Sequence, residues 1–428
     1  MQPTRRQALT GAAALALGGT LAGCRGGDSD DGKLTIEYSW WGSPERDEAI
    51  LAAIDAFEAE NPDIKVEGES TPWGGYWDKL ATMSAGGNSP DVIHMSERYI
   101  LEYGERGALL DLRTLDSVDT SGLDEAVVAL GDSGDGKLYA VTAGLNSFIL
   151  AANVDLFEEA GVELPDDTTW TWEDFYDTSR ALAESGVVGA GYGFGIESFR
   201  PWLHQNGETM YNEDGTAAAF SQEVMESYLE HLLTLRDNGG ATPDQVSEDA
   251  AAASGAGLFE TGQMAMTWTY TNSLAQAAEA AGAEARLLRV PSQTGQASDA
   301  GMYYKGSEFY SISADSDEEK QEAAARFVDF MLNNAEAISA VEMILGVPPN
   351  TSVVEEIADD LNDMDRYVQE FVTDLEEDLT VEAPGPSPIG SGNIQGIFDR
   401  DVLELLYDRA TVPETAQKLI DGINNELG

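Results

Sequence analysis

The chain has 428 residues, of which 42% are hydrophobic, so it is long enough for two domains of about 100 to 200 residues, each with its own core. It carries 78 acidic against 23 basic residues, which gives a formal net charge of −55. Recognition of phosphate needs clustered lysine and arginine, so this balance makes nucleic acid and anionic lipid surfaces poor partners and disfavours acidic ligands; we expect no nucleic-acid partner.

The acidic residues are distributed along the whole chain and alternate with apolar ones, as in the segment 154–159 (VDLFEE). This interspersion predicts a folded protein with a solvated acidic surface, and not a disordered acidic tail. Such a surface is typical of proteins that work in high salt, because screening removes the repulsion between like charges.

The N-terminus has the two parts of a secretory signal peptide. Arg5 and Arg6 supply positive charge, and residues 8–22 form an uncharged apolar run. The run is shorter than the about 20 residues that a spanning helix needs, so we expect a removable signal peptide over 1–23. The letters TRRQAL around the arginines resemble the twin-arginine export motif, with Ala8 in place of the usual aromatic residue, and both twin-arginine and general secretory export stay open.

Cys24 is the only cysteine in the chain. The letters LAGC that end at Cys24 resemble the lipobox of bacterial and archaeal lipoproteins, in which the cysteine is lipidated and becomes the new N-terminus. No intramolecular disulfide can form, and a free thiol in the core is the weaker alternative because no core pattern surrounds it. Residues 24–32 are rich in glycine and aspartate, so we expect a lipidated cysteine on a flexible tether, anchored to the outer face of the cell membrane.

The segment after the tether alternates between strand and helix patterns. Apolar and polar residues alternate over 34–40, as in a strand, and Ser43 followed by a proline predicts the start of a helix that ends at Asn61. The patterns that follow predict, in order, a strand at 64–66, a helix over 76–85 and a buried strand at 90–95. Strands that alternate with helices predict a parallel sheet, in which ligands bind beyond the carboxyl ends of the strands.

The rest of the chain continues this α/β pattern. The predicted elements are strands at 137–141 and 148–153, helices over 172–184 and 221–237, a capping box at 316–319 that opens a helix through Leu332, and a loop at 384–388.

Several segments, in a fixed order, resemble the extracellular solute-binding proteins of ABC importers, and specifically the large sugar-binding family (family 1 type). They are 56–66 (AFEAENPDIKV), 89–92 (SPDV), 136–141 (GKLYAV), 153–157 (NVDLF) with Gly161, 170–175 (WTWEDF), 259–266 (FETGQMAM) and 348–350 (PPN). Each segment is common alone, but together they cover most of the chain from 34 to about 350.

The resemblance implies a two-lobed α/β fold of the periplasmic-binding-protein type (type II), with a hinge and a ligand cleft between the lobes. Lobe I would comprise 33–143 and about 303–347, and lobe II about 147–298 and about 351–428. The implied function is that of a monomeric, non-enzymatic lipoprotein that captures a mono- or oligosaccharide and delivers it to the permease subunits of an ABC importer.

Sugars present apolar faces and hydroxyl edges, so a sugar site needs aromatic rings flanked by hydrogen-bonding carboxylates, amides or arginines. Residues of this kind that lie just past predicted strands or near the implied crossings are the candidate contacts. They are Trp40, Trp41, Trp73, Tyr76, Glu97, Arg98, Trp202, Trp268, Tyr270, Tyr303 and Glu308. For each tryptophan the alternative is a buried core position.

Other chemistry finds little support. The segment 131–138 (GDSGDGKL) resembles a phosphate-binding loop but has Leu138 where a hydroxyl would hold magnesium. The three histidines lack zinc-site spacing, so we expect no metal site, cofactor or catalytic residue. The alternatives that stay open are a secreted polysaccharide-degrading enzyme that uses two carboxylates, and the same fold with a peptide or glycerol phosphate as ligand.

Overall fold

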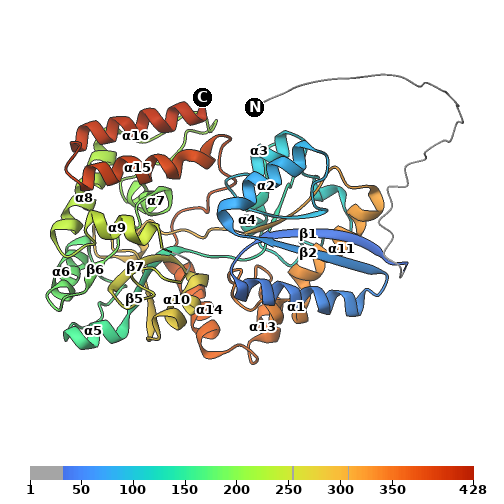
Figure 1. The fold of residues 1–428 in the computed structure, drawn as a ribbon, viewed down its shortest axis with the longest axis horizontal. Coiled ribbons are helices and arrows are strands. Elements are labelled where there is room, and N and C mark those ends of the chain that lie inside the picture. Colours follow the sequence, from blue (N-terminus) through green and yellow to red (C-terminus); the bar gives the residue numbers. More distant parts are fainter. Residues whose placement is uncertain (1–31, 253–254, 307) are drawn as a thin grey trace, which may run out of the picture.

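The computed structural model describes residues 32–252, 255–306 and 308–428, which fold into two α/β lobes (Figure 1). Each lobe is built around its own β-sheet. The predicted signal peptide, Cys24 and the predicted tether up to residue 31 lie outside the described residues. Within the part of the chain that the structure describes, no helix is both long and apolar enough to cross a membrane.

The sheet of the first lobe has the strand order β2-β1-β3-β9-β4. Its strands are β1 (Leu34–Trp41), β2 (Ile64–Thr71), β3 (Val92–Met95), β4 (Val141–Thr142) and β9 (Phe309–Ile312). β1 pairs in parallel with β2 and β3, whereas β9 is antiparallel to β3 and β4. Because β1, β2 and β3 are parallel, their carboxyl ends reach the same edge of the sheet.

Helices cover this sheet, with α1 on one side of β1 and β2 and with α2 and α3 on the other (Figure 1). The helices of the first lobe are α1 (Pro44–Glu60), α2 (Trp73–Ala85), α3 (Ile100–Glu105), α4 (Glu125–Val128), α11 (Glu318–Asn333) and α12 (Ala335–Val341), and α13 (Thr351–Ile357) packs on α12 while its Val353 and Ile357 join the apolar core of the second lobe. α1 begins where the Ser43 hydroxyl accepts the backbone N–H of Arg46. Its Phe57 ring packs edge-on against Phe327 of α11, and α12 packs along α1.

The sheet of the second lobe has the order β6-β7-β5-β8. Its strands are β5 (Phe148–Asn153), β6 (Val188–Ala190), β7 (Met264–Tyr270) and β8 (Ala285–Leu288). Its helices are α5 (Val154–Ala160), α6 (Trp172–Ala183), α7 (Ile196–Gln205), α8 (Gln222–Asp237), α9 (Pro243–Ala250), α10 (Leu274–Ala281), α14 (Asp363–Leu375), α15 (Ile394–Leu406) and α16 (Val412–Leu427). α14 packs against α10, and α15 and α16 pack against α8.

Three segments that run between the lobes are hydrogen-bonded side by side. The backbone N–H of Leu145 donates to the carbonyl of Val347 at 2.8 Å, and the reverse bond is 2.9 Å. Asn146 and Lys305 exchange a similar pair of bonds at 2.9 and 2.7 Å. Gly346 has φ +106°, and a Cβ there would lie 2.8 Å from the Asn146 side chain, so this crossing needs a glycine.

Most predicted elements are confirmed, including those that became β1, α1, β2, β3, β5, α6, α8 and α11. The prediction of a strand over 137–141 is wrong, because only Val141–Thr142 forms a strand. Leu138 makes a single isolated bridge to Asp132, across a turn that contains Gly136 at φ +95°. The helix predicted over 76–85 begins three residues earlier, at Trp73.

Candidate ligand-binding site

A cavity of about 320 Å³ opens between the lobes, where β1 and β3 end. The first lobe contributes the ends of these strands, and the second lobe contributes the end of β7 and the turn after it. The segment that runs back from the second lobe to β9 adds two charged side chains. The lining residues are Trp41, Arg46, Trp73, Ser96, Glu97, Arg98, Tyr270, Asn272, Ser273, Lys305 and Glu308. We call this cavity the cleft site.

Aromatic rings form the first-lobe wall of the cleft site. The Trp41 ring meets Trp73 edge-on, with 5.1 Å between ring centroids, and it meets Tyr76 at 5.2 Å. The Tyr76 hydroxyl donates to the carbonyls of Ser39 and His94, at 3.1 and 2.7 Å, which anchors the start of α2 to the ends of β1 and β3. Trp73 is 43% exposed, so part of its ring is open to the cavity.

A second wall holds the carboxylate of Glu308. Arg46 Nη1 lies 2.8 Å from Glu308 Oε1, and His94 Nε2 lies 3.1 Å from Oε2. The hydroxyl of Tyr38 lies 2.9 Å from His94 Nδ1, and burial lowers the pKa of His94. A neutral imidazole with its proton on Nε2 satisfies both neighbours, so Glu308 is fixed as a hydrogen-bond acceptor at the cavity wall.

Charged side chains from both lobes meet at the floor of the cleft site, in an ion cluster of Glu97, Arg98, Glu197 and Lys305. Lys305 Nζ lies 2.8 Å from Glu97 Oε1 and also binds Glu197 Oε1. Arg98 Nη2 lies 3.3 Å from the same oxygen of Glu197, so an ion pair joins the first lobe to α7 of the second.

Glu197 is the centre of this ion cluster. Its second carboxylate oxygen accepts a hydrogen bond of 3.0 Å from the Tyr303 hydroxyl. Burial alone would raise the pKa of Glu197, but Lys305 and Arg98 hold it well below its ordinary value. Burial would likewise lower the pKa of Lys305, but Glu197 and Glu97 raise it above its ordinary value. Both groups therefore stay charged at neutral pH.

Tyr270 forms the second-lobe wall. It is the last residue of β7, and burial raises the pKa of its phenol to about 12. Lys305 Nζ lies 5.6 Å from the centre of its ring, and Phe148 of β5 packs against the ring at 4.9 Å. The ring is therefore held rigidly and its hydroxyl stays protonated as a donor.

Residues 52–364 match the family model of the bacterial extracellular solute-binding protein. The chain belongs to this family. This solute-binding protein is 27% identical over 182 residues to an uncharacterised lipoprotein of Streptomyces antibioticus, a match that covers 40% of this chain and 39% of that protein. It is 24% identical over 184 residues to a carbohydrate ABC transporter substrate-binding protein of Streptococcus pneumoniae, with coverage of 40% and 37%. The chain thus spans about two fifths of the length of these relatives.

Solved structures share the whole fold. An ABC substrate-binding protein of Listeria monocytogenes, in complex with cycloalternan, superposes with a TM-score of 0.75 at 25% identity, over 92% of this chain and 98% of that one. A periplasmic oligogalacturonide-binding protein of Yersinia enterocolitica, in complex with saturated digalacturonic acid, gives a TM-score of 0.80 at 22% identity, over 92% and 99%. The two-lobed, type II architecture expected from the sequence is confirmed.

The structure brings six of the eleven predicted contacts of this solute-binding protein into the cleft site: Trp41, Trp73, Glu97, Arg98, Tyr270 and Glu308. Tyr76 and Tyr303 support it from behind, through the hydrogen bonds described above.

The three remaining tryptophans lie elsewhere. Trp40 is in the core of the first lobe, 1% exposed, and its indole N–H donates to Asp47 at 2.8 Å. Trp202 lies within α7, where its N–H donates to Ser227, and not just past a strand. Trp268 stacks on Phe148 and lines a separate cavity of about 260 Å³ inside the second lobe.

Sequence reasoning missed Arg46, Asn272, Ser273 and Lys305 of the cleft site. Arg46 lies in the first turn of α1, and Lys305 on a segment without regular structure, so no periodic pattern marked either one. Among the described residues, no group of three or more His, Cys, Asp or Glu side chains is arranged to hold a metal ion.

Proposed function

We propose that this protein captures a carbohydrate in the cleft site and passes it to the permease subunits of an ABC importer. The observation that carries the proposal is the pairing of aromatic rings from both lobes, Trp41 and Trp73 on one side and Tyr270 on the other, around fixed charged groups. Rings cover the apolar faces of a sugar, and groups such as Glu97 and Glu308 accept hydrogen bonds from its hydroxyls.

The relatives support a carbohydrate as the ligand. The Streptococcus pneumoniae relative is a carbohydrate transporter component, and the Listeria monocytogenes structure holds an oligosaccharide. The cleft site, at about 320 Å³, has the volume of a small-molecule pocket.

The N-terminal segment supports a membrane-bound location for this capture. Lipidation at Cys24 would hold the protein at the outer face of the membrane, and the segment that follows would let a monomer reach the permease. The Streptomyces antibioticus relative is itself named a lipoprotein, in keeping with such an anchor.

An enzymatic role finds less support in the same geometry. A glycosidase needs one carboxyl group that carries a proton and a second that is ionised. In the cleft site Glu97 pairs with Lys305, and Glu308 pairs with Arg46 and bonds to His94, so both carboxylates are already engaged by neighbouring side chains. We therefore propose binding without turnover.

The test is a thermal-shift screen of mono- and oligosaccharides in molar salt, with a tripeptide and glycerol phosphate as alternative ligands. A sugar at 100 times its dissociation constant should stabilise the protein by about 2.7 kcal/mol. Reducing ends are assayed in the same mixtures and should not increase. Stabilisation by the peptide or by glycerol phosphate alone, or release of reducing ends, would overturn the proposal.

A further inference from the structure

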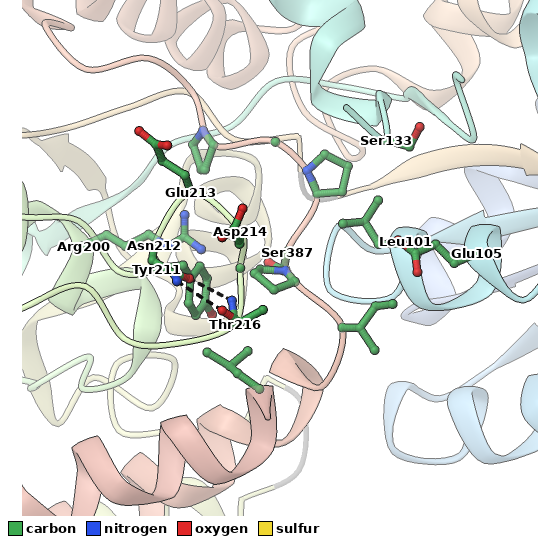
Figure 2. A pocket seen from close by; sticks show the side chains of 17 residues that line it. Leu101, Glu105, Ser133, Arg200, Tyr211, Asn212, Glu213, Asp214, Thr216 and Ser387 are labelled. Carbon is green, nitrogen blue, oxygen red and sulfur yellow. Dashed lines mark hydrogen bonds between the residues drawn. The ribbon is translucent and has the colours of Figure 1, made fainter. Parts of the chain in front are cut away.

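A second and larger cavity, of about 570 Å³, lies between the lobes and is lined by Arg200, which follows Glu197 of the ion cluster by three residues in α7. Figure 2 shows its two walls, with Arg200, Tyr211 and Thr216 of the second lobe facing Leu101 and Glu105 of the first. The loop at 384–389 closes it, and the backbone N–H of Ser387 in this loop donates to the carbonyl of Glu97 at 2.9 Å.

Arg200 is the unusual residue of this cavity. It is only 8% exposed, yet its Nε is buried without a hydrogen-bond partner, and no carboxylate of the described residues forms an ion pair with its guanidinium group. The guanidinium lies between two aromatic rings, 5.7 Å from the centre of Tyr211 and 5.9 Å from that of Tyr303. A buried cation without an anionic partner is costly, so such a group calls for a ligand.

Tyr211 adds a second unmatched donor at the same place. Its hydroxyl is buried and has no hydrogen-bond partner among the described residues. Buried polar groups are nearly always satisfied, so two unmatched donors on one cavity wall indicate that an acceptor binds between them.

The nearest carboxylate cannot serve Arg200 fully. Glu197 lies three residues earlier on the same face of α7, but its oxygens already bind Lys305, Arg98 and the Tyr303 hydroxyl. Glu197 and Glu97 act on Arg200 through their charge, but no carboxylate of the described residues forms an ion pair with its guanidinium group.

We propose that Arg200 and Tyr211 form a subsite for a carboxylate of the ligand, so that the sugar carries a uronic acid unit. A guanidinium group binds a carboxylate through two parallel N–H bonds, and a tyrosine hydroxyl adds a third. The inference rests on the proposed function, because it assigns the acidic unit of a sugar that binds between the lobes.

The negative net charge of the chain does not prevent an anionic ligand group from binding at Arg200. Three carboxylates, those of Glu105, Glu213 and Asp214, also line the cavity, but all three residues are exposed. Salt screens exposed charges much more than a buried guanidinium, so these three carboxylates oppose an anion at Arg200 less as the salt concentration rises.

The experiment is calorimetric titration in molar salt with oligogalacturonides and oligoglucuronides and with their methyl esters. Esterification removes the charge and keeps the sugar, so the ratio of the two affinities isolates the carboxylate. We expect the wild-type protein to prefer the acid about ten- to hundredfold. Arg200→Gln should abolish the preference, Arg200→Lys should retain part of it, and Tyr211→Phe should reduce it severalfold.

Arg180→Gln on the exposed surface of α6 is the matched control, and it should leave the ratio unchanged. Equal binding of acid and ester by the wild type, or a preference that survives in Arg200→Gln, would overturn the subsite. Tyr211→Phe tests it separately if Arg200→Gln does not fold. Binding of neutral sugars without this preference would refute the subsite and leave the proposed function standing. If no sugar binds, both the subsite and the proposed function are refuted. If a free tripeptide binds and its binding depends on Arg200, the ligand is a peptide and not a sugar.

Discussion

At the scale of single residues, burial separates tryptophans that the sequence presents alike. In the sequence, Trp40 and Trp73 both lie at or just past the end of a predicted strand. Trp40 lies beneath the sheet, so close to β2 that a Cβ at Gly68 would come within 2.7 Å of its ring. Trp73 opens α2 and faces the cleft site with 43% of its surface exposed. One ring should therefore serve the core and the other the ligand.

Substitution of these two tryptophans should give opposite results. Trp40→Ala removes a fully buried ring and should lower the free energy of unfolding by about 3 to 5 kcal/mol, with the sugar affinity of the folded fraction unchanged. Trp73→Ala should weaken sugar binding by about 1 to 3 kcal/mol and change the unfolding free energy little. Urea denaturation and calorimetric titration measure the two effects. A loss of affinity in Trp40→Ala with full stability would reverse both assignments.

The sequence could predict which types of residue line the cleft site, but it identified only some of the residues themselves. Glu97 and Arg98 follow a strand pattern, which points to the binding edge of a sheet. No local sequence pattern identifies Arg46 and Lys305 as lining residues. Their positions in the cleft site depend on how α1 and the crossing segments pack against parts of the chain far away in sequence. The burial of Trp40 depends on which face of β1 the helix α1 covers, and that is a property of the tertiary fold.

At the scale of elements, the ends of helices could be predicted from the residues that cap them. Ser43 and Asn61 mark the ends of α1 because they satisfy the backbone groups that a helix leaves free at its ends. The strand predicted over 137–141 failed because a tight turn brings this segment back against the residues just before it. Gly131 lies so close to the carbonyl of Ala140 that a Cβ would be 1.9 Å away, so this segment folds back on itself instead of extending along a partner.

One helix start should respond to pH. Asp365, in the first turn of α14, is buried, and burial together with the neighbouring Glu342 raises its pKa to about 6. Between about pH 4 and pH 6 the native protein keeps a proton that the unfolded chain releases. The free energy of unfolding should therefore fall as the pH rises through this window, and it should not fall further from this cause above about pH 6.

Asp365→Asn tests this directly. The variant should be more stable than the wild type by about 1 to 3 kcal/mol at pH 7, and the difference should vanish near pH 4. Urea denaturation at both pH values gives the two free energies. Asp363→Asn, which removes an exposed carboxylate from the same turn, is the control and should show no comparable gain. A stabilisation by Asp365→Asn that does not depend on pH would contradict the assignment.

At the scale of the whole molecule, the net charge of −55 is spread over both lobes. Most of the 78 acidic residues have no basic partner, since only 23 basic residues exist. Repulsion between them should oppose folding at low ionic strength and should be screened at high ionic strength.

The stability of the protein should therefore depend on salt. We expect the Tm to rise from about 0.1 M to molar NaCl, because at 0.1 M the screening length is still about 10 Å. Differential scanning calorimetry over this series measures the change. Equal stability at both ends would show that the acidic surface is not an adaptation to high salt.

The central claim is that one sugar binds between the two lobes, which requires contributions from both. The direct measurement is calorimetric titration of the sugar found in the screen into the wild type, Trp73→Ala of the first lobe and Tyr270→Ala of the second. We predict one ligand per protein and an affinity weakened by about 1 to 3 kcal/mol in each variant. An unchanged affinity in either variant would place the ligand on a single lobe and contradict the account.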